Sequence, residues 1–157
     1  MLDVGDSISF GTYPRANTCA EGKILFHNLA TSKAIDNLFL LQMLQLYANQ
    51  PGEYQVILFN SGLHGWHLED TTEYQEHYEK VMQGLKEIFP KSQIVVLTST
   101  RVEDKERNVR VQKRNESVKK VVDKLGLSPY GDSVMNSACH AWSCSAAYFI
   151  RKYFRKK

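Results

Sequence analysis

Cysteine is scarce in this 157-residue chain, and long apolar runs are absent. The three cysteines, Cys19, Cys139 and Cys144, are odd in number and widely spaced, which does not fit a disulfide framework. No apolar run reaches the roughly 20 residues that a membrane span needs. The chain also opens without the basic and apolar segments of a secretory signal. These absences predict a cytoplasmic protein with no membrane partner.

Excess charge is also small: 20 lysines and arginines face 17 acidic residues, for a net charge of +3. Much of the excess lies in residues 151–157, and a basic tail of this kind is commonly a solvated helix end. We therefore expect no nucleic-acid partner. The length and the 43% hydrophobic content fit one globular domain over residues 1–157.

Apolar runs alternate with helical patterns along the chain. Strands are expected at residues 1–4, 24–26, 54–59 and 93–98. Helices are expected at residues 32–48, 71–89, 109–125 and 142–154, with Ser32 and Asp70 as N-caps of the first two and Gly126 as the left-handed C-cap of the third. Residues 27–32 and 127–139 are expected to form loops, and residues 11–22 a loop with at most one turn of helix. The 32–48 segment is apolar on most faces, which predicts a heavily buried helix. The alternation predicts a parallel sheet covered on both faces, a three-layer α/β/α fold.

The first strand leads directly into Gly5-Asp6-Ser7, and Ser7 fits two roles at this position. A serine or aspartate here can cap the first turn, and Asp6 is expected to do so. An exposed serine at the carboxyl end of a parallel strand can also be a nucleophile, because ligands bind at that edge of such sheets. A second polar segment, residues 60–67, follows a later strand and contains His64 and His67.

Three blocks together resemble the SGNH (GDSL-type) hydrolases over essentially the whole chain. They are Gly5-Asp6-Ser7-Ile8, the segment Asn60-x-Gly62-Leu63-His64, and a single histidine, His140, before the last expected helix. The resemblance implies a flavodoxin-like parallel sheet, a nucleophilic Ser7 and His140 as its general base. It implies no metal and no organic cofactor.

The resemblance also implies an oxyanion hole. Its donors would be the Ser7 N–H, an N–H near Ala30, and a side chain from Asn60 or His64. His64 stands where the family usually has an asparagine. Substrate-binding roles then fall to three residues of the same loop, namely Gly62, Trp66 and His67.

The last block departs most from the family pattern. The usual Asp-x-x-His is Ser137-Ala138-Cys139-His140 here, so the carboxylate that orients the histidine is replaced by Ser137. Ser137 itself, a backbone carbonyl or Asp132 could orient the ring instead. A pair on a later helix, Arg114-Asn115, is expected to be solvated or to lie behind the site.

Two functions from different classes follow, and a third has weaker support. The first is a serine esterase that cleaves a small O-acyl ester, such as an acetylated carbohydrate, through an acyl-enzyme. The second is a catalytically weakened binding protein on the same fold. The third is a zinc site built from His64, His67, His140 and a cysteine, but this spacing matches no recognised finger. The sequence does not indicate the oligomeric state.

Overall fold

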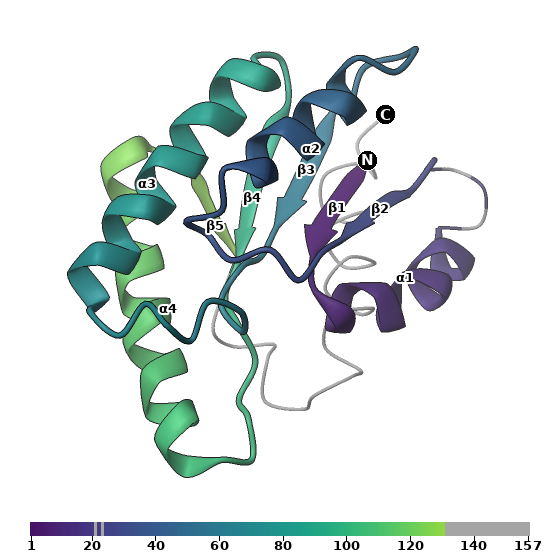
Figure 1. The fold of residues 1–157 in the computed structure, drawn as a ribbon. Coiled ribbons are helices and arrows are strands. Elements are labelled where there is room, and N and C mark those ends of the chain that lie inside the picture. Colours follow the sequence, from purple (N-terminus) through teal and green to yellow (C-terminus); the bar gives the residue numbers. More distant parts are fainter. Residues whose placement is uncertain (21, 23, 131–157) are drawn as a thin grey trace.

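The computed structural model describes residues 1–20, 22 and 24–130, and these residues form a single five-stranded parallel sheet (Figure 1). The strand order is β2-β1-β3-β4-β5. The strands are β1 (Leu2–Gly5), β2 (His27–Ala30), β3 (Val56–Phe59), β4 (Gln93–Leu97) and β5 (Ser128–Tyr130). The helices are α1 (Ser7–Cys19), α2 (Phe39–Ala48), α3 (Thr71–Ile88) and α4 (Lys105–Leu125).

Helices cover both faces of the sheet, which confirms the predicted three-layer α/β/α fold. Helices α2, α3 and α4 lie on one face and α1 lies on the other (Figure 1). Alternate strand residues point to opposite faces. In β3, for example, Ile57 packs in the larger core with α3, whereas Leu58 packs in the smaller core with Ala16 and Ala20.

Helix α1 corrects the expectation of a loop over residues 11–22. It contains Pro14, and it buries small residues against the sheet rather than large apolar ones. The buried positions recur every three or four residues: Ser9, Thr12, Ala16 and Ala20. A count of apolar residues misses such a stripe because half of it is polar. The Ser9 and Thr12 hydroxyls are satisfied by backbone carbonyls within the helix and its cap.

The second strand and the following helix both begin later than predicted. Residues 24–26 precede β2 and Leu25 is 74% exposed, whereas residues 27–30, expected as loop, pair with β1. Ser32 does not cap a helix, because α2 starts at Phe39. The Thr31 hydroxyl instead accepts from the Lys33 amide, and the Asn37 side chain accepts from the Phe39 amide at the start of α2.

Helix α2 is also less buried than expected. Leu40 and Leu44 are buried, but Phe39 and Leu46 are 60% and 67% exposed. The helix packs against α3 and the sheet, and its exposed residues leave an outer face open to solvent in the described part of the molecule.

The later elements follow the predicted pattern more closely. Asp70 caps α3 by accepting from the Thr72 amide at 2.7 Å, as expected. Helix α4 starts at Lys105 rather than at residue 109, since Asp104 accepts from the Arg107 amide. Gly126 ends α4 with φ +62°, the left-handed cap that the sequence predicts.

Strand β5 corrects the expectation of irregular chain after residue 127. It contains Pro129. Because a proline has no N–H to donate to a neighbouring strand, its presence argues against a strand in a reading of the sequence. Its position at the end of the strand order makes the proline tolerable. The expected helix over residues 142–154 lies outside the described residues. Among the helices of the described ranges, none combines the length and the apolar character that crossing a bilayer requires.

Candidate active site

Ser7 stands at the junction between β1 and α1. Asp6 is the N-cap of α1, and its Oδ1 accepts from the Ile8 amide at 2.8 Å. Asp6 is buried, whereas Ser7, the first helical residue, is exposed. The capping role predicted for Asp6 is confirmed. The first amides of a helix lack intrahelical partners and carry its positive dipole end, so this position suits an anion or a developing oxyanion.

A buried polar network lies behind this junction. The Ser9 hydroxyl donates to the Asp6 carbonyl at 3.0 Å, and the Asn28 side chain donates to Ser9 Oγ and to Asp3 Oδ2, each at 3.2 Å. Burial raises the pKa of the Asp3 carboxyl to about 7, a rise that the Asn28 hydrogen bond opposes and the nearby Asp6 reinforces. The network fixes the backbone on which Ser7 stands.

Asn60 joins the ends of three neighbouring strands. Its backbone amide donates to the Val4 carbonyl at 2.9 Å. Its side-chain nitrogen donates to the Leu97 carbonyl at 2.8 Å and to Ser99 Oγ at 3.3 Å. The two side-chain N–H groups therefore already have acceptors on the chain that follows β4.

A small cleft at the carboxyl ends of β1 and β3 brings the first and third blocks together. Gly5 and Asp6 line it together with Asn60, Gly62 and His64. Thr31, Lys33 and Leu40 complete the wall from the chain that follows β2. Ala30, the residue expected near the second oxyanion donor, is the last residue of β2 and pairs with Gly5. The following amide, that of Thr31, donates to the Gly5 carbonyl at 2.8 Å.

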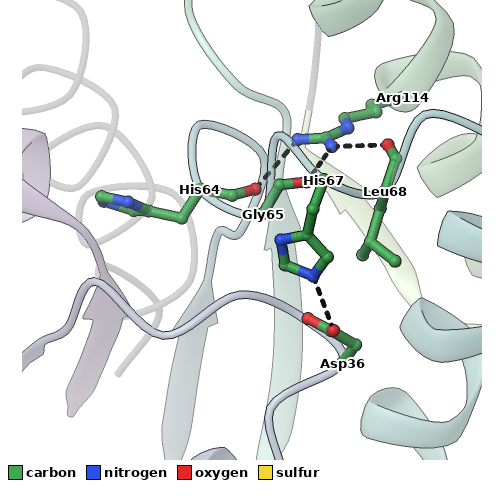
Figure 2. A network of polar contacts seen from close by, with 6 residues as sticks. All are labelled: Asp36, His64, Gly65, His67, Leu68 and Arg114. Carbon is green, nitrogen blue, oxygen red and sulfur yellow. Dashed lines mark hydrogen bonds and ion pairs between the residues drawn. The ribbon is translucent and has the colours of Figure 1, made fainter.

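Arg114, on α4, holds the loop that carries His64 (Figure 2). Its Nη1 donates to the carbonyls of Gly62 and His64 at 3.0 and 2.9 Å. Its Nη2 donates to those of Gly65 and Leu68 at 2.6 and 3.0 Å. Arg114 is 2% exposed, and burial lowers its pKa, although an arginine stays charged in proteins. Of the two alternatives predicted for the Arg114-Asn115 pair, solvation is wrong for Arg114, which is buried and lies behind the loop.

Trp66 and His67 are engaged with protein groups. The guanidinium carbons of Arg107, Arg110 and Arg114 lie 5.3, 5.7 and 5.1 Å from the Trp66 ring centroid. The His67 ring lies 2.8 Å from the Asp36 carboxylate, which ties the loop after β3 to the loop after β2 (Figure 2).

Asn115, the second residue of the pair, holds the loop after β4. Its Oδ1 accepts from the Ser99 amide and its Nδ2 donates to the Ser99 carbonyl, both at 2.9 Å. Neither member was among the predicted site residues, although a place behind the site was one of the two alternatives for the pair. A signal existed for Arg114, because it falls on the buried α4 stripe between Val111 and Val118.

Several predicted site residues lie outside the described residues, namely Asp132, Ser137 and His140. The structure thus brings Asp6, Asn60, Gly62 and His64 to one cleft beside the β1–α1 junction, and it does not describe the base. Within residues 1–20, 22 and 24–130, no group of three or more histidine, cysteine or acidic side chains is placed to hold a metal ion.

Solved structures with the same architecture cover almost the whole chain. A member of the lipolytic G-D-S-L protein family from Veillonella parvula aligns with a TM-score of 0.66 at 14% identity, over 99% of this chain and 98% of its own. The chain has the SGNH hydrolase fold. The acetylxylan esterase Axe2 from Geobacillus stearothermophilus aligns with a TM-score of 0.66 at 12% identity, over 96% and 92% of the two chains.

A carbohydrate esterase whose active site has divergent catalytic and non-catalytic binding functions aligns with a TM-score of 0.57 at 16% identity, over 99% of this chain and 68% of its own. No protein-family model and no curated protein matches the sequence. The SGNH fold accounts for the position of Ser7 at the end of the first strand and of residues 60–64 at the end of the third.

Proposed function

We propose that this protein is a serine esterase that cleaves small O-acyl esters, with acetylated carbohydrates as the favoured substrate class. One observation carries the proposal. An exposed serine begins α1 beside a cleft lined by Gly5, Asp6, Asn60 and His64, at the edge where parallel sheets bind ligands. Structural neighbours that include acetylxylan esterases support the substrate class.

The reaction proceeds through an acyl-enzyme. Ser7 Oγ attacks the ester carbonyl carbon while His140 takes the Ser7 proton. The tetrahedral intermediate collapses, the C–O bond to the alcohol breaks, and His140 returns the proton to the leaving alkoxide. Water then attacks the acyl-enzyme with His140 as base, which releases the carboxylic acid and restores Ser7.

Donors for the oxyanion come from the helix start and the loop after β3. The Ser7 amide is one, and an amide near Ala30 is the second. We favour the His64 imidazole as the third donor over Asn60, because both Asn60 side-chain N–H groups already have acceptors. Gly62 lines the cleft beside it, whereas Trp66 and His67 shape the loop from behind.

Orientation of His140 is the least conventional part of the proposal. A serine, Ser137, stands where the family has the orienting aspartate, so either Ser137, a backbone carbonyl or Asp132 would hold the ring. The absence of the usual carboxylate predicts slower turnover than in a complete triad.

A fluorophosphonate reaction followed by intact-mass measurement tests the proposal without a guess at the substrate. The wild type should gain a single adduct, and Ser7→Ala and His140→Ala should gain none. Ser61→Ala is the matched control, since Ser61 also lines the cleft but has no assigned role. A wild type that gains no adduct at neutral or mildly alkaline pH, or an adduct retained by Ser7→Ala, would contradict the proposal.

A second candidate is a binding protein for carbohydrate or acyl ligands on the same fold. Ser137 in place of the orienting aspartate favours it, as does the structural neighbour whose active site also serves non-catalytic binding. A binder should retain its ligand in Ser7→Ala, whereas an esterase loses turnover in that variant. Calorimetry with acetylated and deacetylated xylo-oligosaccharides, beside the adduct measurement, separates the two functions.

A further inference from the structure

We infer that Arg114 is a positioning residue that sets the loop of residues 61–68 in the conformation needed to stabilise the oxyanion. The inference rests on the proposed esterase function and adds to it a residue remote from the nucleophile in the sequence. Arg114 lies on α4, behind the loop, and its hydrogen bonds to the loop all go to backbone carbonyls (Figure 2).

The contacts of the guanidinium are unusual for a buried charge. Among the described residues Arg114 has no carboxylate partner, and four backbone carbonyls accept from its two Nη atoms. Two aromatic rings flank it, with centroids 4.7 Å away for Tyr74 and 5.1 Å away for Trp66. Tyr74 in turn donates its hydroxyl to the Ser61 carbonyl. Both Arg114 and Tyr74 therefore aim their donors at the same short loop.

These bonds orient peptide planes as well as holding the loop. All described peptide bonds are trans, so each N–H points opposite to the carbonyl of the same peptide unit. The carbonyls of Gly62 and His64 point at Arg114, which turns the amides of Leu63 and Gly65 away from it. The His64 imidazole also projects away from Arg114 (Figure 2).

The side turned away from Arg114 is where the chemistry would occur. Gly62 and His64 line the cleft together with Gly5 and Asp6, the residues next to Ser7. Arg114 thus holds the backbone that carries a proposed oxyanion donor, His64, without lining the cleft itself. Hydrogen-bond donors aimed before the reaction begins are worth most to catalysis, because no reorganisation accompanies charge development.

Lysine cannot replace this arrangement. An arginine presents its donors in a rigid planar fork, whereas a lysine ammonium offers three donors from a single point. Four carbonyls shared between two nitrogens fit the fork, so Arg114→Lys keeps the charge and loses the geometry. Arg107 provides the matched control. It lies over the same Trp66 ring but is exposed, and it bonds no carbonyl of the loop among the contacts described.

The experiment is steady-state hydrolysis of p-nitrophenyl acetate by the wild type, Arg114→Lys, Arg114→Ala and Arg107→Lys. Arg114→Lys should lower kcat about 10- to 100-fold and change KM less than about threefold, because the lost contacts matter in the transition state. Guanidinium ion at millimolar concentration should restore part of the Arg114→Ala activity, and ammonium ion should not. Arg107→Lys should match the wild type.

Amide hydrogen exchange supplies a measurement that does not depend on activity. Exchange in residues 61–68 should be faster in Arg114→Lys than in the wild type and in Arg107→Lys, with α3 and β4 unchanged. Unchanged exchange in the loop overturns the inference, and so does a rise in KM with kcat unchanged. If the wild type neither hydrolyses the ester nor reacts with the fluorophosphonate, the proposed function fails. In that case, faster exchange in the loop of Arg114→Lys would show that Arg114 only stabilises the loop, which overturns its role in catalysis.

Discussion

Ser99 fills the space where a side chain at position 62 would have to go. A Cβ placed on Gly62 would lie 1.9 Å from Ser99 Oγ and 2.9 Å from Ser99 Cβ. Gly62 belongs to the loop after β3, and Ser99 to the loop after β4. The two loops therefore approach closely at the edge that carries the candidate site, and a glycine is required for that approach.

Gly62→Ala should lower the free energy of unfolding by about 1–3 kcal/mol, because the new methyl group collides with Ser99. Ser99→Gly removes both colliding atoms, so the double variant should recover part of that loss. Urea unfolding of the wild type, the two single variants and the double variant gives the coupling energy between the sites. Additive effects would show that the collision is relieved by other movements.

Asn115→Asp should destabilise the protein at neutral pH by about 1–3 kcal/mol. In the wild type, Asn115 Nδ2 lies 2.9 Å from the Ser99 carbonyl oxygen and donates to it. The change replaces this nitrogen with a carboxylate oxygen, so two oxygens face each other. Proximity of these oxygens raises the pKa of the introduced carboxyl in the folded state, so stability should recover as pH falls and the protonated carboxyl donates again.

Asn115→Ala is the control for that substitution. It loses both bonds to Ser99 and introduces no titrating group, so its deficit should stay constant with pH. Urea unfolding between pH 5 and 8 distinguishes the two variants. A pH-independent deficit in Asn115→Asp would argue against the repulsion.

Asp3 should make the protein less stable as pH rises. Its folded pKa of about 7, raised chiefly by burial, exceeds the ordinary value of about 3.9. The stabilisation from the bound proton is complete below about pH 4 and is lost as pH rises to about 7. Asp3→Asn has no such proton to lose, and its Oδ1 can still accept from Asn28.

The measurement is urea unfolding of the wild type and Asp3→Asn from pH 5 to pH 8. The stability of the variant relative to the wild type should increase with pH by up to about 1.4 kcal/mol per unit and level off above pH 7. Glu53→Gln, at an exposed carboxylate paired with Lys91, is the control and should show no such rise. A flat difference for Asp3→Asn would mean that this carboxyl is ionised throughout the range.

His67 should keep the Asp36 carboxyl ionised. Burial alone favours the neutral acid, but hydrogen bonding and charge from His67, with a smaller effect from His77, hold the pKa of Asp36 below its usual value. His67→Ala should raise that pKa toward the ordinary value, and His77→Ala should raise it less. Carboxyl NMR titration measures the pKa of Asp36 in both variants. Equal shifts would mean that the positive charge of nearby histidines lowers this pKa, rather than the 2.8 Å hydrogen bond between His67 and Asp36.

Patterns within a short stretch of sequence were enough to predict several elements. The Asp70 cap and the Gly126 cap depend on bonds between near neighbours, and both are confirmed. The placement of β2, by contrast, depends on its register with β1, since pairing of Leu29 with Val4 decides which residues extend. Helix α1 escaped prediction because Ser9 and Thr12 satisfy their hydroxyls internally and can be buried like small apolar residues.

At the candidate site, the role of Arg114 also depends on contacts between segments that are distant in the sequence. Its position among valines on α4 was visible in the sequence, but a charged residue on an apolar stripe has no partner until the loop after β3 is placed beside it. The roles of Asn60 and Ser99 likewise depend on strands β3 and β4 lying side by side.

The sequence by itself determined most of the alternating strands and helices, and with them the sheet edge that carries Ser7, Asn60 and His64, because hydrophobic periodicity and caps act over a few residues. Only the tertiary structure decided how Arg114 and Asn115 hold the two loops, and that both Asn60 side-chain donors are already used. Those facts depend on backbone carbonyls and side chains brought together from distant segments, and no local pattern encodes the distances between them.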